Sequence, residues 1–175
     1  MRHVYNTFFM ALVILCSFST LPERIEWEES RTLSWEDFKG RPNRRGGFVA
    51  STSSGMSQSY VINSKGILDK KETHVTAHFY PEYSWYIVKD TTARLLKHEQ
   101  THFDITEVHA RILNARIQSY NFSSNSKREV KALYERVEEE RRAMQQAFDE
   151  ETNHSINRDA EKKWEEKIAR LLLPQ

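Results

Sequence analysis

The chain has 175 residues, 26 of them Lys or Arg and 25 of them Asp or Glu, so its formal charge at neutral pH is +1. A chain of this length forms one compact domain. Hydrophobic residues make up 38% and charged residues 29%, with only 5 Gly and 4 Pro, which excludes a collagen-like chain and argues against general disorder. The near-neutral charge gives no basic excess for phosphates, so we expect no nucleic acid partner.

Residues 1–20 have the pattern of a signal peptide. Arg2 precedes an apolar run over residues 8–18, and the small residues Ser17 and Ser19 have the spacing that signal peptidases favour. The run is shorter than the roughly twenty residues of a spanning helix, so we expect no stable membrane span after cleavage. The protein is therefore predicted to be exported, to the periplasm or the outside of a bacterial cell. Cys16, the only cysteine, would be removed with the signal, leaving a mature chain without disulfides.

Residues 21–83 are predicted to form mainly strands. Residues 48–62 are largely uncharged and have apolar ends, and polar and apolar residues alternate over residues 74–80. The turn signal Asn63-Ser64-Lys65-Gly66 lies between these two runs. The simplest arrangement is a twisted antiparallel hairpin.

Residues 84–175 are predicted to be mainly helical. Residues 90–120 contain no Gly or Pro, and one face of the predicted helix carries Leu95, His98, His102, Ile105, His109 and Ile112. A second helix is expected from Ser126, with Glu129 completing a capping box, to about Phe148. A third is expected from Ser155 or Asn157 to about residue 171, after a polar break at residues 149–154. The predicted fold is α+β, a small antiparallel sheet followed by one long helix and two further helices.

The long helix contains the motif His-Glu-x-x-His at residues 98–102. Four residues advance a helix by about 400°, so His98 and His102 project from one face and can bind one zinc ion. Glu99 lies about 100° from His98, which places its carboxylate beside the metal as the general base for a zinc-bound water. With this composition the five-residue pattern occurs by chance in roughly 3% of such chains.

A catalytic zinc needs a third protein ligand and keeps its fourth position for water. His109 lies about 10 Å further along the helix and Glu107 points away, so neither can reach the same ion. The third ligand must come from another part of the chain. We predict His154, in the polar break between the second and third helices, and the alternatives are Asp149, Glu150 and Glu151. Four tyrosines are candidate donors to an oxyanion, and the sequence does not select among Tyr80, Tyr83, Tyr86 and Tyr134.

The chain resembles a bacterial family of predicted secreted zinc-dependent proteases, domain of unknown function 922. The resemblance rests on residues 33–40 (LSWEDFKG), residues 98–105 (HEQTHFDI), Ala110-Arg111, Thr152-Asn153-His154 and Trp164. In the family pattern a Gly follows the position of His154, where this chain has Ser155. The resemblance implies a zincin-like peptidase domain over residues 21–175 and favours His154 as the third ligand.

The function predicted from the sequence is that of a secreted zinc metalloprotease of zincin type. Glu99 would activate the water, and an exposed sheet edge could align an extended peptide or protein substrate. Two alternatives stay open, because the motif fixes the activated water and not the substrate. One is a hydrolase of other amides, and the other is a non-catalytic binding or scaffold protein of the cell envelope with a structural zinc. The sequence indicates no oligomeric state.

Overall fold

The computed structural model describes residues 22–174 apart from Arg44 and Gly46, so the predicted signal peptide, residues 1–20, lies outside the described residues. Two small antiparallel sheets precede three helices, which confirms the predicted α+β class. The elements in chain order are β1 (Ile25–Glu26), β2 (Ala50–Ser51), β3 (Ser54–Ile62), β4 (Leu68–Phe79), β5 (Trp85–Tyr86), α1 (Ala93–Ser119), α2 (Ser126–Thr152) and α3 (Arg158–Leu171). Short 3-10 turns lie at Trp35–Asp37, Pro81–Tyr83 and Val88–Asp90.

The long hairpin of β3 and β4 is the main part of the sheet, as the alternating pattern predicted. Its register pairs Met56 with Ala77, and β1 pairs with the end of β4, giving the strand order β1-β4-β3. The connecting turn needs a glycine, since Gly66 has a φ of 77° and a Cβ there would lie 2.5 Å from the carbonyl oxygen of Ser124. This close approach brings the hairpin tip against the start of α2.

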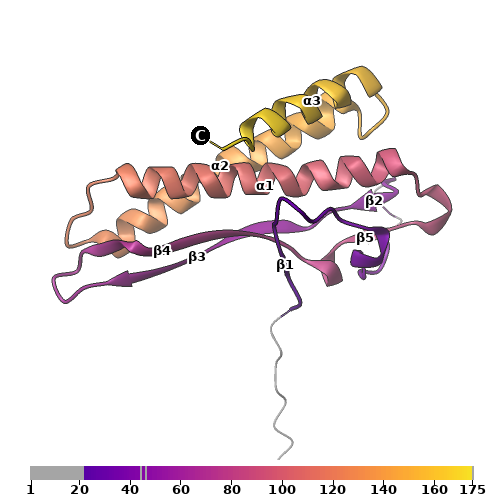
Figure 1. Cartoon of the computed structure of the whole chain (residues 1–175). Coiled ribbons are helices and arrows are strands. Elements are labelled where there is room, and N and C mark those ends of the chain that lie inside the picture. Colours follow the sequence, from indigo (N-terminus) through magenta and orange to yellow (C-terminus); the bar gives the residue numbers. More distant parts are fainter. Residues whose placement is uncertain (1–21, 44, 46, 175) are drawn as a thin grey trace, which may run out of the picture.

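The second sheet consists of only β2 and β5, paired antiparallel through Ala50 with Tyr86 and Ser51 with Trp85. Figure 1 shows β2, the beginning of α1 and the α2–α3 turn gathered at one end of the molecule. The hydroxyl of Thr52, just after β2, donates to the carbonyl oxygen of Glu99 at 3.2 Å. This bond fixes the β2 segment across the part of α1 that carries the His-Glu-x-x-His motif.

Helix α1 is the central element of the fold. Its N-cap is Thr92, whose hydroxyl accepts a bond from the backbone N–H of Leu95. One side of α1 packs on the hairpin through Phe103 and Leu113, and another side packs on α2 and α3 through Ile105. Such a helix, buried on two sides, is rigid enough to hold side chains at fixed positions.

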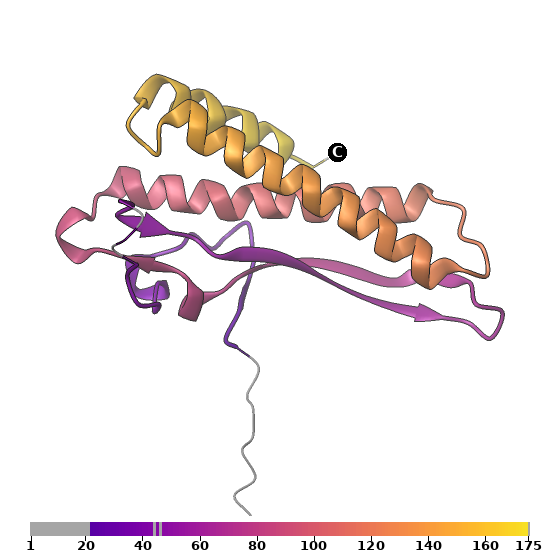
Figure 2. The same ribbon diagram turned by 180° about the vertical axis from the view of Figure 1, so that it is seen from behind.

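Helix α2 begins at Ser126, as predicted, but its capping and its end differ from the prediction. Its N-cap is Asn125, and the Glu129 carboxylate accepts from the backbone N–H of Ser123 at 2.9 Å, so the predicted capping box is wrong. The hydroxyl of Ser126 instead donates to the carbonyl oxygen of Gly66 at 2.6 Å, and Figure 2 shows the start of α2 at the hairpin tip. The helix continues past Phe148 to Thr152, which makes the first part of the predicted polar break helical.

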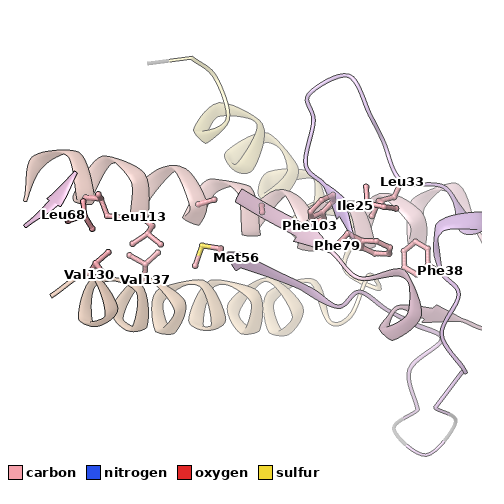
Figure 3. Close-up of a cluster of buried hydrophobic side chains, with 13 residues drawn as sticks. Ile25, Leu33, Phe38, Met56, Leu68, Phe79, Phe103, Leu113, Val130 and Val137 are labelled. Atoms are coloured by element: carbon pink, nitrogen blue, oxygen red, sulfur yellow. The ribbon is translucent and has the colours of Figure 1, made fainter. Parts of the chain in front are cut away.

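Two groups of buried side chains hold the layers together. The larger lies between the sheet, α1 and α2, and Figure 3 shows it extending from Leu68 and Val130 near the hairpin tip to Phe38 and Phe79 at the other end. The smaller joins α1, α2 and α3 through Ile105, Val108, Phe148, Trp164 and Ile168. Among the described helices, none combines the length and the apolar character that crossing a membrane requires.

Candidate metal centre

Two imidazole rings from α1 form one side of the site. His98 and His102 are one turn apart, and their Nε2 atoms lie 3.2 Å from each other. Both rings are held by Phe148 of α2, which stacks on His98 with a centroid distance of 4.5 Å and meets His102 edge-on at 5.0 Å. Aromatic contact of this kind restricts the rings to one orientation. The structure therefore confirms that both histidines project from one face of α1.

Asp149, in the last turn of α2, completes a group of three ligand atoms. Its Oδ1 lies 3.2 Å from Nε2 of His98 and 3.0 Å from Nε2 of His102. A tetrahedral zinc ion with bonds of about 2.0–2.1 Å places its donor atoms about 3.3 Å apart. Within residues 22–174 apart from 44 and 46, this is the one group of at least three His, Cys, Asp or Glu side chains with metal-ligand spacing. The three atoms therefore fit one face of a tetrahedral site.

Each of the two imidazole rings has a hydrogen-bond partner at its other nitrogen, Nδ1. Nδ1 of His98 lies 3.2 Å from Oε1 of Glu161, whose side chain is 3% exposed and comes from α3. Nδ1 of His102 bonds to the side-chain oxygen of Gln145, whose amide group in turn donates to the backbone oxygen of His102. Metal-binding histidines are typically oriented by a carboxylate or carbonyl on the distal nitrogen. Neither partner was predicted, because neither is linked to the motif by its spacing in the sequence.

The electrostatics of the group favour a cation. Burial would raise the pKa of the Asp149 carboxyl, but hydrogen bonds and charge from His102 and His98 hold it well below its usual range. Burial would lower the pKa of His102, but its bond to Asp149 and the charges of Asp149 and Glu99 raise it. A metal ion at this point can take the place of the imidazole proton as the partner of the carboxylate.

Glu99 is buried beside the histidine pair. Its side chain is 3% exposed, and its Oε2 has no hydrogen-bond partner among the residues that the structure describes. An unpaired buried carboxylate oxygen is costly, and such groups are kept where chemistry uses them. The position and the free oxygen fit a general base for a metal-bound water.

His154 lies at the rim of the site. Its Nδ1 is 3.6 Å from Oδ1 of Asp149, its side chain is 48% exposed, and its ring packs edge-on against Phe48 at 4.9 Å. The backbone at Asn153, His154 and Ser155 is left-handed, with φ values of 47°, 50° and 69°. Each such residue costs about 1–2 kcal/mol. A glycine at position 155 would adopt this conformation without that cost.

The strained turn is held by the side chain of Ser155. Its hydroxyl accepts a bond from Nη1 of Arg94 at 3.0 Å, and the same guanidinium group lies 3.3 Å from Oε2 of Glu161. The turn that carries His154 is thereby tied both to α1 and to the carboxylate that orients His98.

The remaining acidic and histidine candidates have other partners. Glu150 accepts a bond from Gln146, and Glu151 accepts one from the indole N–H of Trp164 at 2.8 Å. On α1, Glu107 pairs with Arg111, and Nδ1–H of His109 donates to the backbone oxygen of Ile105 at 2.7 Å. His109 and Glu107 are therefore away from the group of ligand atoms, as predicted.

A cleft of about 770 Å³ opens onto the site. Its walls are the segment 47–52, which includes β2, the first three turns of α1, and the α2–α3 turn. Within the described residues no tyrosine lines this cleft, so none of Tyr80, Tyr83, Tyr86 and Tyr134 borders it. Arg94 and His154 are among the polar residues that do border it.

Most of the site lies in the part of the chain that matches a known family of sequences. Residues 30–155 match the pattern of a family described as bacterial protein of unknown function, DUF922. The chain belongs to the DUF922 family. The DUF922 match includes His98, His102, Asp149 and His154, whereas Glu161 lies beyond it. Comparisons with curated proteins and with solved structures gave no match.

Two residues near the start of the described chain bond to the helix that carries the motif. The backbone N–H of Leu33 donates to the side-chain oxygen of Gln100 at 2.7 Å. Asp104 accepts one bond from Gln100 and another from the indole N–H of Trp27. The polar residues Gln100 and Asp104 therefore attach the segment that contains Trp27 and Leu33 to α1 of this DUF922 protein, on the side away from His98 and His102.

The contact between Glu161 and His98 leads to a prediction. Replacing Glu161 by Gln should lower the affinity for zinc by about 10-fold to 100-fold, because the carboxylate that orients the imidazole is lost. The measurement is competition with a chelator of known affinity, and Glu166→Gln, an exposed position on the same helix, is the control. Equal zinc affinity in the Glu161 variant and the wild type would show that this carboxylate does not position His98.

Proposed function

We propose that this DUF922 protein is an exported zinc metallopeptidase. His98, His102 and Asp149 hold the ion, and Glu99 acts as general base. The observation that carries the proposal is the triangle of Nε2, Nε2 and Oδ1 atoms beside the free oxygen of a buried glutamate. The ligand role predicted for His154 stays a prediction, and metal content in variants tests it.

The chemistry of the donor atoms supports a catalytic zinc rather than a structural one. Two imidazoles and one carboxylate, with a fourth position open to water, are typical of hydrolytic zinc sites. Structural zinc sites usually have four protein ligands rich in cysteine, and the only cysteine of this chain, Cys16, belongs to the predicted signal. Zinc at such a site lowers the pKa of a bound water to about 7.

The residues around the ion have separate roles. Glu99 takes the proton of the attacking water as the new C–O bond forms, and it passes this proton to the amide nitrogen, so that the C–N bond of the tetrahedral intermediate then breaks. Glu161 and Gln145 keep the two rings in place. We assign to His154, exposed at the rim and next to Asp149, a hydrogen bond to the oxyanion that develops on the scissile carbonyl.

The edge of the β2 segment supports a peptide as substrate. The backbone oxygen of Val49 accepts from Ile87, and both the N–H and the oxygen of Ser53 bond to the β4–β5 side of the segment. Because backbone groups alternate along a strand, Ala50 directs its N–H and C=O away from β5, on the side of the cleft. An extended peptide can add to this edge as a further strand.

Metal content and hydrolysis together test the proposal. The protein lacking residues 1–20 should contain one zinc per chain and cleave an unstructured protein, and a zinc chelator should stop cleavage until zinc is restored. Bound zinc without cleavage of any protein would contradict the peptidase and favour an envelope scaffold. Hydrolysis of small amides but not of peptides would contradict it in favour of another amide hydrolase.

A further inference from the structure

The cleft continues on both sides of the metal centre. A second hollow of about 570 Å³ begins where the first ends, between the segment 52–54 and the last turns of α2. His102, Asp149 and His154 line both hollows, so the ligand atoms lie at their junction. The two hollows follow the β2 edge in opposite directions from the metal, one toward residue 47 and one toward residue 54. A bound chain would therefore have residues on each side of the reacting bond.

The hollow toward residue 47 has apolar walls. Phe48 from the β2 segment is 46% exposed, and Ile156 from the α2–α3 turn is 70% exposed, while Leu95 of α1 is buried at the base. Among the described residues that line this hollow, Arg94 is the one Lys or Arg, and it pairs with Glu161. Large exposed apolar side chains from separate segments, facing one hollow, favour an apolar side chain as its occupant.

The hollow toward residue 54 has polar walls. Hydroxyl groups of residues 52–54 lie on one side, and the side of α2 contributes Arg141, Arg142, Gln145, Gln146 and Glu150. Both guanidinium groups pair with Glu138, so this wall has no strong excess of either charge. A wall of hydrogen-bonding side chains of mixed charge does not favour one class of substrate side chain over another.

The direction of the β2 segment determines which hollow holds the residue before the scissile bond and which holds the residue after it. Antiparallel pairing is the more stable mode of strand addition. The segment runs from residue 47 to residue 54, so an antiparallel peptide runs from the polar hollow to the apolar one. The residue that contributes the carbonyl then lies on the polar side, and the residue that contributes the amine lies on the apolar side.

We propose that this protein cleaves extended polypeptides immediately before a large apolar residue, such as Leu, Ile or Phe, with little selectivity for the residue that precedes the bond. This inference rests on the proposed peptidase function. Phe48 and Ile156 are its specificity residues. Hydrolysis by water then leaves the apolar residue at the new amino terminus and a carboxylate on the preceding residue.

The first test is the mapping of cleavage sites by mass spectrometry on a mixture of unstructured peptides. We expect an apolar residue after the cleaved bond to be favoured at least 10-fold over Asp, Gly or Ser. Phe48→Ser and Ile156→Ser should each reduce this preference, and Val61→Ser, an exposed apolar position far along β3, should not. Apolar residues enriched before the bond, or no enrichment, would overturn the inference.

The second test measures binding and separates the inference from the proposed activity. A fluorescent decapeptide with one central Leu, and its Leu→Ser counterpart, are titrated into the zinc-loaded Glu99→Gln protein. We expect at least 10-fold tighter binding of the Leu peptide, reduced by Phe48→Ser and not by Val61→Ser. If no protein or peptide is cleaved, the proposed peptidase function is wrong. Equal binding of the two peptides would independently contradict the apolar subsite.

Discussion

Glu99→Gln should abolish peptide hydrolysis by the zinc-loaded protein while the zinc stays bound. Glutamine has nearly the same volume as glutamate, so the packing around the buried position persists, but its amide cannot take a proton from the attacking water. Loss of a positioned general base typically lowers the rate by about 10²-fold to 10⁴-fold. The measurements are kcat/KM on a fluorogenic peptide and the zinc content of the same preparation.

A matched control lies on the same helix. Glu107 is two turns further along α1, and its carboxylate bonds to Arg111 at 2.8 Å, away from the ligand atoms. Glu107→Gln should therefore change kcat/KM by less than a factor of about two. If the Glu99 variant keeps a full zinc complement and more than a tenth of the wild-type activity, Glu99 is not the general base.

The parts of the fold that were predicted correctly depend on local patterns. The α1 helix was expected over residues 90–120 and occupies Ala93–Ser119, because an uninterrupted apolar periodicity leaves no other regular structure. The hairpin was recognised from alternation and from a turn that ends in Gly66. In both cases the signal lies within about thirty consecutive residues.

The end of α2 could not be predicted in the same way. Polar residues 149–154 look like a break because their side chains compete with the backbone for hydrogen bonds. In the folded chain the hydroxyl of Thr152 bonds to the backbone oxygen of Phe148 at 2.7 Å and is fully buried. The contact of Phe148 with Trp164 of α3 provides the tertiary packing that extends the helix.

This extension also places Asp149, which the sequence offered as an alternative to His154, next to both histidines. One more helical turn places Asp149 on the face of α2 that looks toward α1, and the left-handed turn at residues 153–155 then sets His154 at the rim. Glu161 and Gln145 depend on the packing of three helices, which no local pattern encodes. The histidine pair and Glu99 could be located from sequence because their spacing lies within one helix.

Asp149→Asn should remove most of the bound zinc, whereas His154→Ala should keep zinc and lose activity. Asp149 supplies the one carboxylate in contact with both imidazoles, and its replacement removes the negative charge that offsets the ion, so we expect zinc affinity to fall by more than about 100-fold. His154 is 48% exposed and lies 3.6 Å from that carboxylate, so its removal leaves the three ligand atoms in place. Loss of an oxyanion donor costs about 10²-fold to 10³-fold in kcat.

Zinc content and kcat, measured on the same preparations, distinguish the role of Asp149 from that of His154. Glu150→Gln is the control, because Glu150 adjoins Asp149 but bonds to Gln146. Zinc lost from the His154 variant and retained by the Asp149 variant would reverse the assignment and make His154 the third ligand. Loss from both variants would mean that the ion has four protein ligands. A closed site of that kind leaves no position for water, and it would contradict the peptidase in favour of a structural zinc.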